Sequence, residues 1–327
     1  MNEPASEREF RILALSGGGY LGLYSAAVLA ALEEQIGEPI GRRFDLIAGT
    51  SVGGIIAAAV AFELPLARLV QFFVLHGTEV FSPRAMPSGA VARLLDLSRS
   101  VLGPKYANNA LRDAIDERLG EATFDQALHP LVLPAVNVTR SLTKVFKTPH
   151  ARASRGDEHV RVADAVLAAC AAPAYLPAVK LGDELYADGG LYAVAPDQVA
   201  LHEAEHFIGV DKERVRMLSI GTATVGYRPA EGVDADAGAV GWLSDGRLIL
   251  TLIAVQQQHV QAMMEDRLGT RYLRLDANWP ADAGLGIDVA TPEAATTLVE
   301  LARRTIHDVD RRRLRAFLSG GLQPARV

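Results

Sequence analysis

The sequence is poor in cysteine. Cys170 is the only one among 327 residues, so no disulfide framework can form within the chain, which is typical of proteins kept in a reducing compartment. Positive charge is not in excess either, because 33 lysines and arginines stand against 39 acidic residues and the net charge is −6. A nucleic-acid polymer is therefore not expected as a partner.

Long uninterrupted hydrophobic runs are also missing. Residues 1–10 are polar and acidic, so no signal peptide is predicted. The most apolar windows are broken by Gly53-Gly54, Glu63 or Pro65 before they reach the roughly 18 residues that a membrane span needs. Because 49% of the residues are nonetheless hydrophobic, a large buried core is expected, and the predicted location is the cytoplasm.

The most informative segment is a short strand, a turn and a helix. The run Leu46 to Ala48 is typical of a buried strand, and an alanine- and isoleucine-rich helical pattern follows shortly after it. Between them stands the G-x-S-x-G motif Gly49-Thr50-Ser51-Val52-Gly53. In this context the motif indicates a nucleophile elbow, in which glycines permit a sharp turn that exposes the serine hydroxyl. Ser51 is therefore the candidate nucleophile.

A glycine-rich turn lies earlier in the chain, between a strand expected over residues 10–15 and a helix expected over residues 23–35. Its glycines are Gly17, Gly18, Gly19 and Gly22. Their spacing fits the dinucleotide-binding pattern G-x-G-x-x-G, but that pattern requires an acidic residue at the end of the next strand, and Asp45 stands before that strand. Such a turn can also direct several backbone amides at one anion.

A third turn carries a carboxylate. The short strand that ends at Asp188 is followed directly by Gly189 and Gly190. Asp-Gly alone is an ordinary turn signal. Combined with the serine elbow and the glycine-rich turn, it makes Asp188 the candidate partner of Ser51.

These three motifs, in this order, resemble those of the patatin-like phospholipases. Gly17 to Gly22 matches the glycine-rich oxyanion loop of that family, Gly49 to Gly53 its nucleophile elbow, and Asp188 to Gly190 its aspartate turn. The small-residue segment Ala168 to Pro177 is also similar to the one that precedes the aspartate in that family. The resemblance covers about residues 10–225.

The resemblance implies hydrolysis of glycerophospholipid esters by a Ser–Asp dyad. Ser51 would attack the ester carbonyl, Asp188 would accept its proton, and the amides of Gly17 to Gly19 would stabilise the oxyanion. Neither a metal nor another cofactor is implied. The chain departs from the family pattern at Leu21, where many members carry Arg or Lys, and at residues 193–197, where many carry an Asn-Asn-Pro-like run.

Three alternatives are open. An α/β-hydrolase triad would join Ser51 and Asp188 to one of four histidines, namely His202, His206, His259 and His307. A zinc metalloprotease is suggested by His202-Glu203-Ala204-Glu205-His206, which fits H-E-x-x-H, although no convincing third ligand follows. A non-catalytic binding module is the third, and the presence of both Ser51 and Asp188 argues against it.

The expected fold class is α/β, a patatin-like three-layer α/β/α arrangement with a mostly parallel central sheet. A single domain is predicted over residues 1–327, with the motifs in 10–225 and a helical C-terminal part in 242–320. Residues 63–130 are expected to be mostly helical. Further strands are expected over 131–138, 216–221 and 272–275, and further helices over 164–172, 199–207, 248–268 and 291–317.

Three interpretations concern residues outside the motifs. Cys170 is expected to be a core residue. Residues 81–104, interrupted by prolines and glycines, are a candidate lid. The arginines of the last helix are interleaved with Asp308 and Asp310 and are expected to form a solvated face, with contact to anionic lipid headgroups as the alternative.

A finer resemblance concerns regulation. Residues 197–206 and 219–224 are similar to segments of the patatin effectors of bacterial antiphage systems, which cyclic nucleotides switch on. This similarity implies a cyclic-nucleotide activator, a role in antiviral defence, and peripheral attachment to the inner membrane, whose phospholipid is the substrate. The sequence contains no recognisable motif for binding the activator, and it is compatible with a homo-oligomer.

Overall fold

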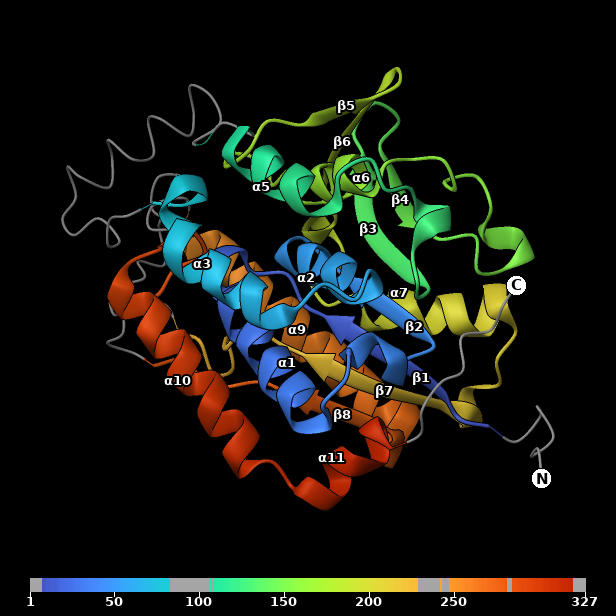
Figure 1. Ribbon diagram of the computed structural model, residues 1–327, viewed down its shortest axis with the longest axis vertical. Coiled ribbons are helices and arrows are strands. Elements are labelled where there is room, and N and C mark those ends of the chain that lie inside the picture. Colours follow the sequence, from blue (N-terminus) through green and yellow to red (C-terminus); the bar gives the residue numbers. More distant parts are fainter. Residues whose placement is uncertain are drawn as a thin grey trace.

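The computed structural model describes residues 8–82, 106, 109–228, 242, 247–280 and 284–319, so the candidate lid over 81–104 lies outside the described residues except for Phe81 and Ser82. A single sheet runs through the centre of the molecule (Figure 1). Its eight strands are β1 (Phe10–Leu15), β2 (Leu46–Gly49), β3 (Leu131–Asn137), β4 (Leu142–Lys147), β5 (Val179–Leu181), β6 (Glu184–Asp188), β7 (Val215–Ile220) and β8 (Tyr272–Leu275).

Helices connect most of these strands. They are α1 (Gly22–Ile36), α2 (Val52–Ala61), α3 (Leu66–Val80), α5 (Asn109–Leu119), α6 (Val162–Ala169), α7 (Asp197–His202), α9 (Arg247–Leu268), α10 (Pro292–Asp308) and α11 (Arg311–Leu318). A π-helical segment, Glu203–Ile208, continues α7 directly.

The strand order is β5-β6-β3-β2-β1-β7-β8, and β4 pairs with β3 off this path. The five strands β3, β2, β1, β7 and β8 are mutually parallel. The strands β4, β5 and β6 each run antiparallel to their neighbours. The predicted mostly parallel sheet is therefore confirmed. Ser51 follows a strand of its parallel part, whereas Asp188 ends a strand of its antiparallel part.

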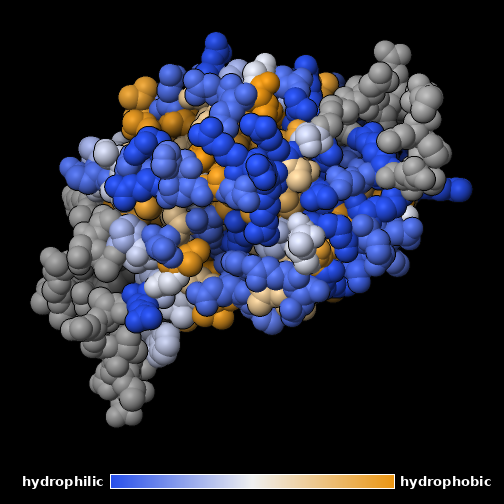
Figure 2. All heavy atoms as spheres, turned by 90° about the horizontal axis from the view of Figure 1, so that it is seen from below, coloured by the Kyte–Doolittle hydropathy of each residue, from blue (hydrophilic) through white to orange (hydrophobic). Residues whose placement is uncertain are grey.

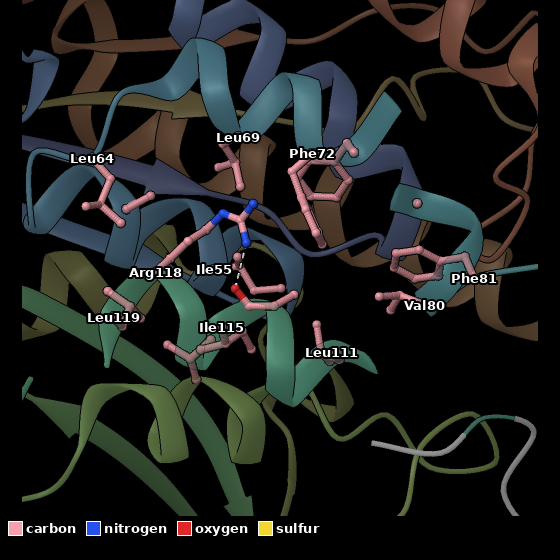
Figure 3. Close-up of a pocket in the computed structure, with 15 residues that line it drawn as sticks. Ile55, Leu64, Leu69, Phe72, Val80, Phe81, Leu111, Ile115, Arg118 and Leu119 are labelled. Carbon is pink, nitrogen blue, oxygen red and sulfur yellow. Dashed lines mark hydrogen bonds between the residues drawn. The ribbon is translucent and has the colours of Figure 1, made fainter. Parts of the chain in front are cut away.

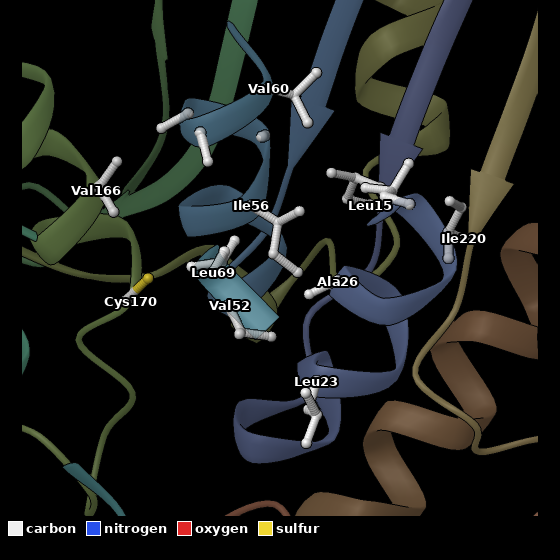
Figure 4. Packing of buried hydrophobic residues seen from close by; sticks show 14 of the residues in the cluster. Leu15, Leu23, Ala26, Val52, Ile56, Val60, Leu69, Val166, Cys170 and Ile220 are labelled. Atoms are coloured by element: carbon white, nitrogen blue, oxygen red, sulfur yellow. The ribbon is translucent and has the colours of Figure 1, made fainter. Parts of the chain in front are cut away.

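Both faces of the sheet are buried, as the apolar strand sequences require. Successive strand side chains point to opposite faces, so Leu13 and Leu15 of β1 pack into one core while Ile12 and Ala14 pack into the other. The first core includes side chains of α1, α2, α6 and α10, and Figure 4 shows part of its packing around α2. The second core contains side chains of α7 and α9. Helices therefore cover both faces, and the predicted three-layer arrangement is confirmed.

Several predicted boundaries were wrong. The helix expected over 291–317 is two helices, because the Asp310 carboxylate accepts hydrogen bonds from the amides of Arg312 (2.8 Å) and Arg313 (3.3 Å) and so begins a new helix there. The strands β4 and β5 were not predicted. Most of their side chains are at least partly exposed, and polar residues interrupt the apolar ones in both, so they lack the continuous apolar run of a buried strand.

The surface offers no extended apolar band on the face shown in Figure 2, where hydrophobic residues occur in small separate groups among hydrophilic ones. Of the arginines in the C-terminal helices, Arg303 and Arg304 pair with Glu300 (2.8 and 2.9 Å). That pairing agrees with the solvated face expected there. Within the described ranges, no helix combines the length and the apolar character needed to cross a bilayer.

Candidate active site

Ser51 occupies a strained turn between β2 and α2. Its backbone has φ 55° and ψ −129°, a conformation that is uncommon for a residue with a Cβ and that recurs at functional sites. The turn is tight on both sides, because a Cβ at Gly53 would overlap the carbonyl oxygen of Leu15. The helix α2 begins at Val52, so its positive dipole end lies next to the serine. The predicted nucleophile elbow is therefore present in geometry.

The sheet register brings Asp188 to the same level as Ser51. In the parallel pair of β2 and β3, Ala48 lies opposite Val132, and Ser51 follows Ala48 by three residues. Three residues beyond Val132 is Ala135, which lies opposite Asp188 in the antiparallel pair of β3 and β6. The aspartate thus approaches the serine from a strand that runs in the opposite direction, which the motif alone does not indicate.

Asp188 is positioned to act on the Ser51 hydroxyl. Its carboxylate accepts a hydrogen bond from the Gly190 amide (2.7 Å), and the residue is only 4% exposed. Burial raises the pKa of Asp188 to about 6, and the neighbouring Ser51 hydroxyl and Gly190 amide oppose this rise because they favour the ionised carboxylate. A carboxylate with this pKa is a stronger base than an ordinary aspartate and is still mostly ionised at neutral pH.

The glycine-rich turn faces the same site but does not offer all its amides. The Gly17 amide donates to the carbonyl of Val194 (2.8 Å), and the Tyr20 amide donates to that of Ile287 (2.7 Å). For Gly18 and Gly19 no backbone acceptor is found among the residues that the structure describes. The Gly17 amide is therefore already used within the protein, and only the amides of Gly18 and Gly19 remain as candidate donors to an oxyanion.

Gly19 is confined to glycine for two reasons. It has φ 59°, and a Cβ there would overlap the carbonyl oxygen of Ile287. Gly22 lies against Val52 at the start of α2, so it serves the packing of the loop on the elbow. The turn glycine Gly189 lies against the backbone of Pro134 in β3, where no side chain would fit.

These elements surround a pocket of about 240 Å³. Ser51, Asp188 and the turn of Gly17 to Gly19 form one wall, and most of the remaining lining is apolar. Leu191 and Leu252 belong to that lining and are 57% and 45% exposed. The pocket can therefore accept an apolar substrate with an electrophilic carbon placed at Ser51.

The candidate histidines lie elsewhere. No histidine is among the described residues that line the Ser51 pocket. His259 and His307 are exposed on α9 and α10. The rings of His202 and His206 are exposed and stack on each other with centroids 5.0 Å apart. None of the four is therefore placed to complete a triad with Ser51.

The H-E-x-x-H segment is also arranged unlike a zinc site. Glu203, its would-be base, is buried and accepts hydrogen bonds from Lys147 (2.9 Å), His150 (3.0 Å) and Ser154 (2.6 Å). These partners lower the pKa of Glu203 to about 2 against the effect of burial. Within the described residues, no group of three or more His, Cys, Asp or Glu side chains could hold a metal ion. Glu203 instead ties the π-helical segment to the end of β4.

Sequence reasoning missed a buried polar cluster behind the glycine-rich turn. Its centre is Arg274 of β8, whose guanidinium donates to Asp276 (2.9 Å), Ser219 (2.8 Å) and the side-chain oxygen of Gln257. The Gln257 amide in turn donates to the carbonyl of Gly17 (3.4 Å). Leu21, where many members of the resembled family carry a cation, is fully buried. Here a cation lies behind the loop instead. The one sequence feature that could have indicated this cluster is Gln257, a glutamine on the buried side of α9.

Cys170 is a buried neighbour of the site and not a second nucleophile. Burial, together with the charge of Asp188, raises the pKa of its thiol well above the ordinary value. The thiol therefore stays protonated at neutral pH, and a thiol is a poor nucleophile. Figure 4 shows the side chain beside the core around Val166, as predicted for a core residue.

Known proteins are similar to this chain over most of its length. A family model described as patatin-like phospholipase matches residues 13–201. A cGAMP-activated phospholipase of Pseudomonas aeruginosa is 36% identical over 298 residues, which cover 91% of this chain and 84% of the relative. A cGAMP-activated phospholipase of Vibrio cholerae is 32% identical over 326 residues, covering 91% and 90%. One of Escherichia coli is 30% identical over 300 residues, covering 85% and 82%.

Proposed function

The chain belongs to the patatin-like phospholipase family, and we propose that it hydrolyses glycerophospholipid esters with Ser51 as the nucleophile and Asp188 as the base. The observation that carries this proposal is the buried Asp188 carboxylate, which lines the same largely apolar pocket as Ser51 and lies close enough for the Ser51 hydroxyl to lower its pKa. The similarity to phospholipases over nine-tenths of the chain supports the substrate class.

In the proposed first step, the Ser51 oxygen attacks the ester carbonyl carbon while its proton passes to Asp188. The negative charge that develops on the carbonyl oxygen is stabilised by the amides of Gly18 and Gly19 and by the positive end of α2, and one such donor is typically worth ~3 kcal/mol. The lysophospholipid alkoxide then leaves and takes the proton from Asp188. The acyl group remains on Ser51.

In the proposed second step, a water molecule gives a proton to Asp188 and attacks the acyl-enzyme. The oxyanion is stabilised by the same amides, and the collapse releases the fatty acid as Ser51 recovers its proton. A single carboxylate therefore serves as base and then as acid in each half of the reaction. Its raised pKa suits both roles, because the protonated form must also give the proton back.

We further propose that a cyclic nucleotide activates the enzyme in antiviral defence. The support is that the three relatives described above are each named cGAMP-activated phospholipases. Cytoplasmic location, peripheral attachment to the inner membrane during activity, and a homo-oligomer belong to the same proposal. Exposed Leu191 and Leu252 at the pocket support contact with a lipid surface.

The decisive experiment measures free fatty acid and lysophospholipid by mass spectrometry after incubating the purified protein with phospholipid liposomes. Four reactions are needed: wild type and Ser51→Ala, each with and without cGAMP. Product should form only with wild type and should increase strongly when cGAMP is present. Equal product from Ser51→Ala would refute the dyad, and equal wild-type product without cGAMP would refute activation by that nucleotide.

A further inference from the structure

A second apolar pocket lies beside the Ser51 pocket, between α3 and α5, and we propose that it receives the distal part of the fatty acyl chain. This inference rests on the proposed function, because it places the chain of the ester that Ser51 attacks. Nothing in the sequence motifs points to it. It follows from three properties of the pocket, which are its position next to the Ser51 pocket, its apolar lining and the placement of Arg118 in its wall.

The pocket adjoins the pocket of Ser51. Four residues line both pockets, namely Ile55, Val80, Phe81 and Leu111. Ile55 lies in the first turn of α2, directly beside Ser51, because its amide donates to the carbonyl of Ser51 (3.3 Å). A chain attached to the Ser51 oxygen can therefore pass Ile55 and enter the second pocket without crossing the core.

The lining selects an apolar occupant. The second pocket has a volume of about 50 Å³, and its walls are aliphatic and aromatic side chains of α2, α3 and α5 (Figure 3). Leu69, Leu111 and Ile115 contribute to it and are each 5% exposed. A polar group placed there would lose its hydrogen bonds to water without replacement. Each buried methylene, in contrast, favours binding about fourfold.

Arg118 stands in the wall of the second pocket. Its guanidinium lies 4.2 Å from the centroid of the Phe72 ring. It donates to the carbonyl of Ala114 (2.9 Å) and pairs with Glu117 (3.1 Å). Figure 3 shows the hydrogen bond to the Ala114 carbonyl and the aromatic ring of Phe72 nearby. Because Nη1 makes both the Ala114 and the Glu117 contact and the guanidinium is held against the Phe72 ring, we take Arg118 as the limit of the route for the chain.

If the acyl chain extends from Ser51 into the second pocket, the enzyme should prefer long acyl chains to short ones. A short acyl group fills only the pocket next to Ser51, whereas a long one gains further contacts between α3 and α5. The residue to change is Ala114 of α5, which lines the second pocket only. A tryptophan there would fill the pocket without touching Ser51 or Asp188. Asp113→Trp, at an exposed position of the same helix, is the matched control.

The test compares kcat/KM for the acetyl, octanoyl and palmitoyl esters of p-nitrophenol. Ala114→Trp should leave the acetyl ester unchanged and lower the palmitoyl ester by roughly tenfold or more, the effect of excluding about two methylenes. Asp113→Trp should keep the wild-type profile, and Phe72→Ala, which lengthens the pocket, should raise the palmitoyl rate relative to the octanoyl rate. If Ala114→Trp and Asp113→Trp share the wild-type profile, the inference is wrong.

A second measurement does not depend on how Ala114→Trp folds. A crystal structure of the wild-type protein carrying a hexadecyl phosphonate on Ser51 should show the alkyl chain passing Ile55 between α3 and α5. A chain directed past Leu191 and Leu252 instead would overturn the inference while leaving the proposed function intact. Full ester hydrolysis by Ser51→Ala would overturn both, so the two failures can be told apart.

Discussion

Gln256 and Gln257 are consecutive residues of α9, and their side chains hold two different loops of the candidate active site. Gln256 accepts a hydrogen bond from the Val194 amide (3.2 Å) and donates to the carbonyl of Gly190 (3.4 Å). Gln257 donates to the carbonyl of Gly17 (3.4 Å). Neighbouring helix residues point about 100° apart, so one helix reaches both the aspartate turn and the glycine-rich turn. A displacement of α9 would therefore alter the two turns together.

Replacing Gln257 with leucine should lower activity without removing the fold. The change deletes the hydrogen bond to Gly17 and leaves the buried Arg274 without one of its acceptors. We expect a loss of about 2 kcal/mol in the free energy of unfolding, the usual cost of leaving a buried polar group unpaired. The value of kcat for a short ester should fall roughly tenfold, since about 1.4 kcal/mol of lost alignment corresponds to that factor.

Gln261→Leu is the control for this change. Gln261 lies one turn further along α9 and makes a surface hydrogen bond to Glu265 (2.8 Å). Short-ester kinetics and denaturant unfolding of this variant should match those of the wild type. A Gln257→Leu enzyme with wild-type kcat would show that the glycine-rich turn holds its shape without α9.

Ser51→Ala and Asp188→Asn should each abolish hydrolysis of a short-chain ester. The double variant should be scarcely worse than either single variant, because residues that act as one unit lose their effect together. The measurement is kcat/KM together with circular dichroism to verify the fold. Alanine at His202, His206, His259 or His307 should leave the rate unchanged, because none of these residues lines the pocket. If one of these histidine variants were inactive while Asp188→Asn remained active, the result would favour a triad that includes that histidine.

Metal removal should have no effect on ester hydrolysis. The proposed dyad needs no Lewis acid, and Glu203 of the H-E-x-x-H segment is held by Lys147, His150 and Ser154. Dialysis against a chelator followed by the short-ester assay tests this, with elemental analysis of the protein before and after. Stoichiometric zinc that is lost together with activity, and again in His202→Ala, would favour the metalloprotease alternative.

The strands with two buried faces could be predicted from the sequence because each carries a continuous apolar run. The strand β4 has no such run, since only Phe146 of its six residues is buried, and it was therefore missed. The division of the last helix depends on the Asp310 side chain, which was noted only as a charge between arginines. The prediction of a single domain over 1–327 stays a prediction.

The candidate site likewise contains residues that local sequence patterns identify and residues that only long-range packing brings there. Ser51, Asp188 and the glycine-rich turn carry signals within a few residues of themselves, so their types and spacing identify them. Gln257 and Arg274 reach the site from more than 200 residues after Ser51, and their contacts depend on where α9 and β8 pack. The hydrogen bond from the Gly17 amide to the carbonyl of Val194 also joins residues that are far apart in the sequence. No local pattern contains that information.

The raised pKa of Asp188 predicts how activity depends on pH. The proposed base is the ionised carboxylate, and its pKa is about 6 in the folded protein. The value of kcat/KM for a short ester should therefore fall about tenfold per pH unit below that pKa and be flat above it, up to the next ionisation. A profile that stays flat down to about pH 4, near the ordinary aspartate pKa, would mean that Asp188 is not the titrating base.

The same pKa predicts that the buried Asp188 carboxylate costs stability at neutral pH. Its folded-state value of about 6 lies above the ordinary 3.8, so the folded protein binds this proton more tightly than the unfolded chain. The free energy of unfolding therefore falls as pH rises from 3.8 to about 6, and the deficit persists above that pH. About two pKa units correspond to about 3 kcal/mol.

Asp188→Asn, which cannot ionise and whose amide oxygen can still accept from Gly190, should therefore be inactive yet more stable than the wild type near neutral pH. The gain should approach about 3 kcal/mol at pH ~7 and vanish at pH ~4. Urea unfolding of both proteins at the two pH values measures it. Asp113→Asn, at an exposed position, should change little at either pH. An Asp188→Asn protein that is less stable than the wild type at neutral pH would mean that hydrogen bonds to the carboxylate outweigh its burial, and the raised pKa on which both pH predictions depend would be wrong.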